Sequence, residues 1–420
     1  MRRLMFTGAV VLVVCAALFF AGTAVLTAEE GKDAPPSPAP PKEKPAAKDD
    51  AAVKAKAIAS MKKAIEYLKK SLNADGAVEI QAGPQKIVNA GMTALVMNAF
   101  NRLPDELKGD VKEILPKMAA FLVKSQNPDG SIQGQADQSN YQTALAAIAL
   151  MRYDKETYKD AIKKAITYLL FIQVVDEKDI AYGGWGYKKN DPSTPEKKYQ
   201  SADLSNTHFT LEALNLYGDN TSEAYKRAVK FLERCQNRSE SNDSEKVDPS
   251  VKVGNDGGCV YGPGNTRSGN IIKTPEGKIE YVSYASMTYA GLKSLIYANV
   301  SKDDPRVQAA WNWVKKNYTL DENYGMGTRD KKGSQLQGLY YFYHIFAKAM
   351  QALGEKKIVT QDGVEHDWRI ELIEKIVTLQ KPDGSWVNSE AKWLEDIPIL
   401  VSAYTLEAMD IAYYELNSNK

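Results

Sequence analysis

The sequence predicts an all-α fold in which six helical hairpins close into an (α/α)6 toroid. Two observations carry this prediction. A phrase repeats along the chain: FLVKSQNPDGSI begins at Phe121, KIVTLQKPDGSW begins at Lys375, and YLKKSLNADGAV at Tyr67 is a weaker copy. Each copy lies between a segment with one charged face and a segment with almost no charge. Such internal repeats indicate one supersecondary unit stacked on itself.

The first 28 residues are predicted to lie outside this fold. Arg2 and Arg3 precede a charge-free stretch from Leu4 to Ala28 that is rich in Val, Ala, Leu and Phe. This is the pattern of a secretory signal peptide. The stretch is also long enough to span a bilayer, so an uncleaved N-terminal membrane anchor is the alternative. We therefore expect an exported protein of a bacterial cell envelope, periplasmic or extracellular, and membrane-anchored in that alternative.

Residues 29–52 contain mainly Pro, Ala, Lys and Asp and no aromatic side chain. This composition predicts a disordered, semi-extended linker, after which the toroid occupies residues 53–420. In the whole chain 54 Lys and Arg residues balance 53 Asp and Glu residues. We expect no nucleic-acid partner, because such binding needs a basic excess or a basic patch.

Each repeat is predicted to open with an amphipathic outer helix. Apolar residues recur at i, i+3 and i+4 with Lys and Glu between them, which gives one buried and one wet face. The helix then stops at an Asn-Pro-Asp-Gly or Lys-Pro-Asp-Gly turn, because Pro cannot continue a helix. The six outer helices lie around Ala64, Met118, Ala165, Val229, Trp311 and Ile373.

A second helix of nearly uncharged residues follows each turn. Helices of this composition are buried on most sides, so we expect them to form an inner ring. An open solenoid of stacked hairpins is the alternative to a closed toroid. The inner helices begin near Val88, Tyr141, Leu204, Tyr284, Gly338 and Pro398.

The repeated phrase resembles the aromatic-Leu-x3-Gln-x3-Gly-x-Trp repeat of squalene and oxidosqualene cyclases and, more loosely, of protein prenyltransferase β-subunits. The resemblance covers roughly residues 53–412 and implies an α/α toroid with a central cavity. The Gln is expected to bond loop backbone, and the Trp to pack on the neighbouring hairpin. The matching residues are Phe121, Leu122, Gln126 and Gly130 in one repeat, Gln380, Gly384 and Trp386 in the last, and the GGWGY segment that begins at Gly183.

The same resemblance points to Asp203 as a candidate catalytic acid. These cyclases protonate their substrate with the middle Asp of a DxDDT segment. Here the matching segment runs from Asp203 to Thr207, and Ser205 replaces the middle Asp. A serine cannot protonate an alkene, so cyclase chemistry is predicted to be lost. Asp203 and Asp396, which follows Glu395 before the last inner helix, are the candidate acids, and helix capping is the alternative for both.

No metal and no cofactor is predicted. Prenyltransferase β-subunits bind zinc through Asp, Cys and His, and Tyr341 to His344 resembles the segment that carries their His. The expected Asp and Cys are missing near Tyr284. The Asp-Gly turns lack the alternating acids of a calcium loop. For Cys235 and Cys259 we favour two unpaired thiols over a disulfide.

Aromatic and histidine side chains at the inner-helix starts and in the loops are the candidate ligand-lining residues. Packing between hairpins is the alternative for each of them. We expect the lumen to hold an apolar small molecule or an extended envelope polymer. The alternatives are a divergent enzyme (an isoprenoid cyclase, or a lyase or hydrolase of an envelope polymer) and a scaffold that binds a protein through residues 238–280. The candidates are Tyr141, Trp185, Tyr187, His208, Tyr261, Tyr284, Tyr340, Tyr343, His344 and Trp386.

Overall fold

The computed structural model describes residues 50–82, 85–134, 138–187, 202–218, 222–328 and 331–418. The predicted signal segment, residues 1–28, and all of the predicted linker before Asp50 lie outside these residues. The first helix, α1 (Asp50–Lys69), begins at Asp50. No helix of the described part is both long and apolar enough to cross a bilayer.

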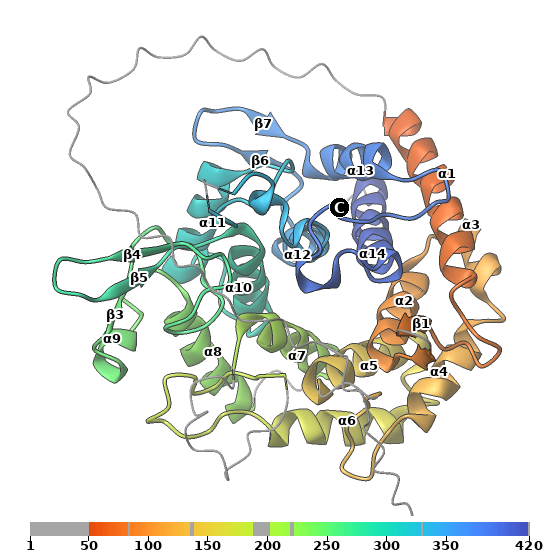
Figure 1. The fold of residues 1–420 in the computed structure, drawn as a ribbon, viewed down its shortest axis with the longest axis horizontal. Coiled ribbons are helices and arrows are strands. Elements are labelled where there is room, and N and C mark those ends of the chain that lie inside the picture. The colour runs from red at the N-terminus through yellow and green to blue at the C-terminus, as the bar shows by residue number, and fades with distance from the viewer. Residues whose placement is uncertain are drawn as a thin grey trace, which may run out of the picture.

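Outer and inner helices alternate along the chain and form two concentric rings (Figure 1). Each inner helix packs on the next one, and the last inner helix packs on the first, so the predicted toroid is confirmed and the open solenoid is excluded. The outer helices are α1, α4 (Leu115–Lys124), α6 (Lys159–Phe171), α8 (Glu223–Cys235), α11 (Pro305–Asn317) and α13 (Trp368–Leu379). The inner helices are α2 (Ala90–Arg102), α5 (Ser139–Asp154), α7 (Leu204–Tyr217), α10 (Ala285–Tyr297), α12 (Leu339–Leu353) and α14 (Pro398–Asn417).

Short elements occupy the connections. α3 (Asp105–Lys108) and α9 (Ser244–Val247) are single turns of helix. β1 (Glu79–Ala82) pairs antiparallel with β2 (Gln85–Val88), and β6 (Ile358–Val359) pairs antiparallel with β7 (Glu365–His366). Within residues 238–280 and just after them, the order is β3 (Val251–Lys252), β5 (Ile279–Tyr281) and β4 (Ile271–Lys273), with β3 parallel to β5. No alternating pattern in the sequence marks these strands, because none exceeds four residues.

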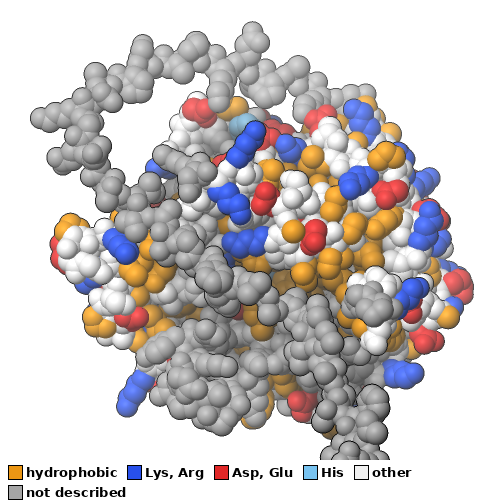
Figure 2. All heavy atoms as spheres, viewed as in Figure 1, with side chains coloured by type: hydrophobic (Ala, Val, Ile, Leu, Met, Phe, Trp, Pro, Cys, Tyr) orange, Lys and Arg blue, Asp and Glu red, His pale blue; other side chains and the backbone are white. Residues whose placement is uncertain are grey.

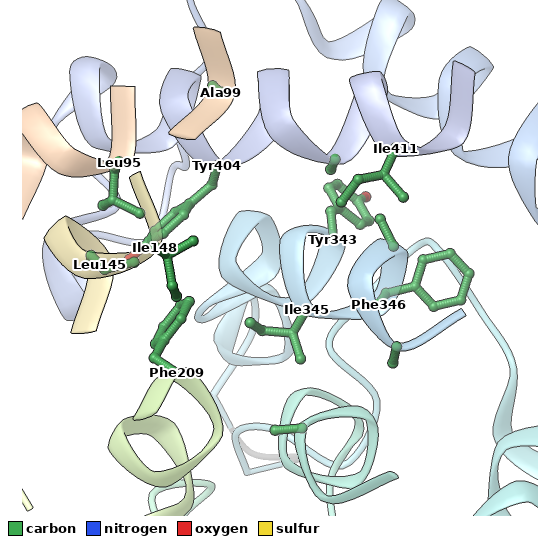
Figure 3. Close-up of a cluster of buried hydrophobic side chains, with 14 of the residues drawn as sticks. Leu95, Ala99, Leu145, Ile148, Phe209, Tyr343, Ile345, Phe346, Tyr404 and Ile411 are labelled. Carbon is green, nitrogen blue, oxygen red and sulfur yellow. The ribbon is translucent and has the colours of Figure 1, made fainter. Parts of the chain in front are cut away.

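The space inside the inner ring is filled with side chains. In Figure 3, Leu95, Leu145, Ile148, Phe209 and Tyr404 point toward one another from α2, α5, α7 and α14. All five are buried. This packing explains why the inner helices lack a polar face, since each has neighbours on every side. Figure 2 shows charged side chains over the rim of one face and apolar side chains between them.

The predicted glutamine contacts tie four of the six outer helices to the next one, and Leu72 and Tyr318 take the place of the glutamine after α1 and α11. Nε2 of Gln126 donates to the carbonyl oxygens of Gly130 (3.1 Å) and of Ala161 in α6 (2.9 Å). The same double contact recurs at Gln173 with α8 and at Gln236 with α11. Gln380 closes the ring, because it donates to the carbonyl of Ser60 in α1 at 3.0 Å and accepts from the Ser60 hydroxyl at 2.8 Å.

The glycine of each turn lies against the outer helix of the next hairpin, which is also the helix that the glutamine contacts. Gly384 has φ +91°, and a Cβ there would lie 2.4 Å from the carbonyl oxygen of Lys63. Gly130 has φ +93° and would meet Lys164 in the same way at 2.4 Å. A larger residue therefore faces both an unfavourable backbone conformation and a collision with backbone.

Two further contacts fix the turn to its own hairpin. The indole N–H of Trp185 donates to the Leu169 carbonyl at 2.7 Å, and that of Trp386 to Ile376 at 2.8 Å, so this bond goes to the outer helix of the same hairpin. The backbone N–H at the Trp position donates to a hydroxyl near the start of the inner helix. These pairs are Val78–Thr93, Ile132–Thr143, Trp185–Thr207, Cys259–Thr288 and Trp386–Ser402, at 2.8–3.0 Å.

Cys235 and Cys259 are both buried and both free, as expected.

Replacing Gly384 by Ala should destabilise the closed ring. Gly218 is the matched control, because its φ of +97° is similar but nothing lies within 4 Å of its Cβ position. Both variants lose about 1–2 kcal/mol from the left-handed backbone. Gly384→Ala should lose roughly 1–3 kcal/mol more from the collision with the Lys63 carbonyl. Urea unfolding measures both, and equal losses would contradict the proposed role of the turn in closing the ring.

Candidate functional site

The two ends of the inner ring differ in charge. Each inner helix follows a loop from its outer helix, so all six start at one end of the toroid and finish at the other. We call the starting end the mouth. Helix N-termini carry partial positive charge and C-termini partial negative charge. In accord with this, the buried acids Asp203 and Glu395 lie at the mouth, and Arg102 and Arg152 lie in the last turns of α2 and α5.

Asp203 caps α7 at the mouth. Its carboxylate accepts from the backbone N–H of Asn206 at 2.8 Å and from the Asn206 side chain at 2.9 Å. The hydroxyl of Tyr261 also donates to it. Burial raises the pKa of Asp203 to about 6 against these contacts. The residue thus caps a helix and also holds a proton close to neutral pH.

A row of hydroxyls lies beside Asp203. Tyr187 lies near Tyr261 and Ser205 and is 36% exposed. The Ser205 hydroxyl lies 2.7 Å from the hydroxyl of Tyr341, which lies 2.8 Å from Nε2 of His208. The position that holds the acid in the cyclases therefore belongs here to a serine within a neutral hydrogen-bonded row.

Residues outside the predicted set complete the mouth. The Arg267 guanidinium lies 4.9 Å above the ring of Tyr261. Tyr141 approaches Tyr187 with ring centroids 6.2 Å apart, and its hydroxyl lies 2.7 Å from that of Tyr404. Tyr341 and Arg267 were not among the candidate lining residues, because no repeat position marks them.

The other candidate lining residues lie apart from this group. Tyr284 is buried at the N-cap of α10. Tyr343 donates to the Leu320 carbonyl at 2.7 Å and packs edge-to-face on Tyr340. Trp185 and Trp386 hold the turns, and His344 lies deep in the ring. Whether any of these contacts a ligand stays a prediction.

Of the two adjacent acids before α14, Glu395 is buried and Asp396 is exposed. The Glu395 carboxylate accepts from the backbone N–H of Tyr341 at 2.8 Å and from the Asn388 side chain at 2.6 Å. It therefore caps α12, and burial raises its pKa to about 7 despite these hydrogen bonds. Asp396 is not brought near Asp203 by any contact among the described residues.

A set of ion pairs fills the middle of the ring; we call it the axial network. Every inner helix contributes one charged side chain to it. Glu212 accepts from Arg152 at 2.7 Å, from Lys293 at 2.9 Å and from Lys348 at 3.1 Å. The members are Arg102, Arg152, Glu212, Lys293, Lys348 and Glu407, from α2, α5, α7, α10, α12 and α14 in that order.

Glu407 is the second carboxylate of the axial network. It accepts from Arg152 at 2.9 Å, from Lys348 at 3.0 Å, from Arg102 at 3.1 Å and from Nε2 of His344 at 2.9 Å. Burial alone would raise the pKa of Glu212 and Glu407, but the surrounding cations hold both well below the usual value. Both are therefore ionised at neutral pH.

His208 joins the mouth to the axial network. Its Nδ1 lies 2.9 Å from Nζ of Lys293, and its Nε2 bonds Tyr341. Burial and the charge of Lys293 hold the pKa of His208 well below its usual value, so the imidazole is neutral. A continuous hydrogen-bonded row thus runs from Ser205 through Tyr341, His208 and Lys293 to Glu212.

The spacing of charged residues on the inner helices marks the axial network, and the sequence analysis did not identify it. A charged residue follows the hydroxyl anchor of the inner helix by five residues at Glu212, Lys293 and Glu407, and by nine at Arg102 and Arg152. Because five and nine differ by about one helical turn, all of them lie on one helix face.

No group of three or more His, Cys, Asp or Glu side chains that could hold a metal occurs within the described ranges.

Two family models match the chain. Residues 82–249 match the squalene-hopene cyclase C-terminal domain, and residues 176–364 match the prenyltransferase alpha-alpha toroid domain. The resemblance to the cyclase and prenyltransferase superfamily that the repeats predicted is therefore confirmed. No curated protein matches the sequence.

Solved structures with similar folds include two kinds of enzyme. A type II terpene cyclase from Scytonema aligns with a TM-score of 0.53 at 13% identity, over 86% of this chain and 99% of that chain. A variant of that cyclase solved with its substrate, geranylgeranyl dihydroxybenzoate, aligns equally well. A GH76 α-mannanase from Bacteroides thetaiotaomicron aligns with a TM-score of 0.54 at 10% identity, over 88% of this chain and 100% of that chain. At these identities the likeness shows the fold alone.

The buried carboxyl of Glu395 should make stability fall as pH rises. Its folded pKa of about 7 lies above the unfolded value of 4.5, so the folded state retains its proton longer between these values. Glu395→Gln should remove on the order of 2 kcal/mol of this decline in the free energy of unfolding. The exposed neighbour gives the control, Asp396→Asn, which should leave the decline unchanged. Urea unfolding at several pH values between 4.5 and 7 tests this, and an unchanged slope in Glu395→Gln would contradict it.

Proposed function

We propose that this chain is an exported toroid that binds an extended, polar polymer of the cell envelope across its mouth. The observation that carries the proposal is the axial network. An apolar ligand placed on the axis would contact paired, buried charges and would have to displace their partners. Uncovering one member of a buried ion pair costs about 3–5 kcal/mol. The axis of this toroid is therefore a poor place for an apolar small molecule.

The comparisons are compatible with this choice. The toroid architecture is shared by a cyclase solved with an apolar substrate and by mannanases, which are named for a polysaccharide. The fold itself therefore does not select between the two ligand classes. The side chains on the axis favour the polar class.

The chemistry of the mouth suits a chain of sugars. An exposed ring such as Tyr187 packs on the C–H face of a sugar, and Arg267 offers hydrogen bonds to its hydroxyls. Residues 238–280 contribute Tyr261 and Arg267 to this group, so the insert forms part of the mouth. We therefore prefer a ligand-binding role of the insert to a separate protein-binding role.

A strained turn extends the mouth. Trp393 and Leu394 have φ of +59° and +67°, and Trp393 is 41% exposed. Their neighbour Lys392 donates to the Arg267 carbonyl at 3.3 Å, which places the turn beside Arg267. Such backbone strain in non-glycine residues is typical of functional sites. Trp393 thus offers a second exposed aromatic face to an extended ligand.

Export rests on the charge-free stretch from Leu4 to Ala28 after Arg2 and Arg3. N-terminal sequencing of the chain recovered from its host separates the two alternatives. A first residue at Glu29 or Val25 indicates cleavage, and an intact N-terminus in the membrane fraction indicates an anchor.

Replacing Tyr187 by Ala should weaken binding of the polymer. We expect about a tenfold loss of affinity, because one aromatic contact contributes roughly 1–1.5 kcal/mol. The control is Tyr414→Ala, since Tyr414 is 65% exposed near the end of α14, away from the mouth. Titration calorimetry against a panel of soluble polysaccharides that includes α-mannan, with squalene in detergent beside it, gives the affinities. Stoichiometric squalene binding, or equal losses in both variants, would contradict the proposal.

A second candidate is a hydrolase or lyase of the same polymer. The pKa of Asp203, about 6, favours this enzymatic role. A proton donor works best when its pKa lies near the working pH. In the same incubations, new reducing ends released by the natural chain and not by Asp203→Asn would support this candidate. Binding without release would leave the chain a binding protein.

A further inference from the structure

A pocket opens at the end of the toroid opposite the mouth. Its volume is about 380 Å³, which lies within the range of small-molecule sites. Residues of α2, α5, α7, α10 and α12 surround it, so it lies where the inner helices finish. The lining residues are Asn101, Arg102, Arg152, Glu212, Asn215, Leu216, Tyr297 and Gln351.

The pocket is the place where the axial network reaches solvent. The side chains of Arg102 and Arg152 are 21% and 12% exposed, whereas Glu212, Lys293, Lys348 and Glu407 are almost fully buried. The two arginines are thus the members of the network that a solute can reach.

The axial network carries more positive than negative charge. Its four cations, Arg102, Arg152, Lys293 and Lys348, face two carboxylates, Glu212 and Glu407, which leaves a surplus of two positive charges. Asp410 lies nearby on α14, and burial and the charge of Glu407 raise its pKa well above the usual value. Neither of its oxygens has a hydrogen-bond partner among the described residues.

Arg102 keeps a donor for a further partner. Its Nε donates to Glu407 and its Nη1 to Oε1 of Gln351 at 3.2 Å. Its Nη2 has no hydrogen-bond partner within the described part of the chain. Arg152 lies beside it and, after burial, lowers its pKa by charge repulsion, whereas Glu212 and Glu407 raise the pKa of Arg152. Partial charges of the helix C-termini attract both arginines but do not use this donor.

We propose that this pocket binds a small anion through its carboxylate or phosphate oxygens, with Arg102 as the principal contact and Arg152 behind it. Planar guanidinium groups bind both kinds of oxyanion in a two-pronged manner. The cationic lining disfavours metal ions, and the charges disfavour apolar solutes. This site is separate from the mouth and does not depend on the polymer proposed above.

The test is titration calorimetry of the folded chain with inorganic phosphate and with citrate at constant ionic strength. We expect saturable binding of at least one of them at one site per chain. Arg102→Gln should weaken it at least about tenfold, because a charge-assisted hydrogen bond is lost. The matched control is Arg306→Gln. Arg306 has the same exposure, 20%, and its own ion pairs with Asp304 and Glu233 on the outer ring. This control should bind like the natural chain.

A second variant guards against loss of folding in Arg102→Gln. Leu216 lines the pocket, is 37% exposed and takes no part in the axial network. Leu216→Trp should fill the pocket and weaken binding while the ion pairs stay intact. Absence of saturable binding of both anions, or equal binding by the natural chain and Leu216→Trp, would overturn the proposal.

Discussion

The centre of this toroid depends on two buried carboxylates. Glu212 and Glu407 each accept from three or more cationic or imidazole groups, and together they connect all six inner helices. Ion pairs in such a setting contribute little net stability compared with apolar packing, but losing one partner is costly. Their value is therefore specificity: the six helices satisfy these charges in one register only. The apolar contacts around Phe209 and Tyr404 supply the burial that holds the ring together (Figure 3).

The axial network makes the interior of this toroid different from the open lumen that the fold alone would suggest. A toroid with an empty, aromatic lumen could surround a long hydrocarbon. Here the hydroxyl row from Ser205 to His208 and the ion pairs behind it occupy the axis. Only the two ends of the ring remain available for contacts with a ligand. The mouth presents Tyr187 and Arg267, and the far end presents Arg102 and Arg152.

Much of the fold could be predicted because it is written locally. The glutamine and the glycine make contacts within the turn or to the next outer helix, and the indole bonds the outer helix of its own hairpin, so the repeats that carry these residues encode their hairpins locally. The axial network could not be found in the same way. Arg102, Lys293 and Glu407 each look like one isolated charge near a helix end, and only closure of the ring brings them together. Nor could the sequence tell Glu395 from Asp396, since a loop decides which of two neighbours turns inward. The short strands lie in glycine-rich and polar segments that have no alternating pattern.

The contact between Gln380 and Ser60 joins residues 320 positions apart. All other glutamine contacts of this kind span at most 70 positions, so each hairpin can pair with its successor soon after both exist. Closing the long loop is entropically the slowest of these steps. We therefore expect closure to come last, from an open arc whose two ends expose apolar helix faces until α14 packs beside α1. A chain that lacks its last hairpin would remain an open arc with apolar helix faces exposed at both ends. Such an arc would bind chaperones and would nucleate aggregation.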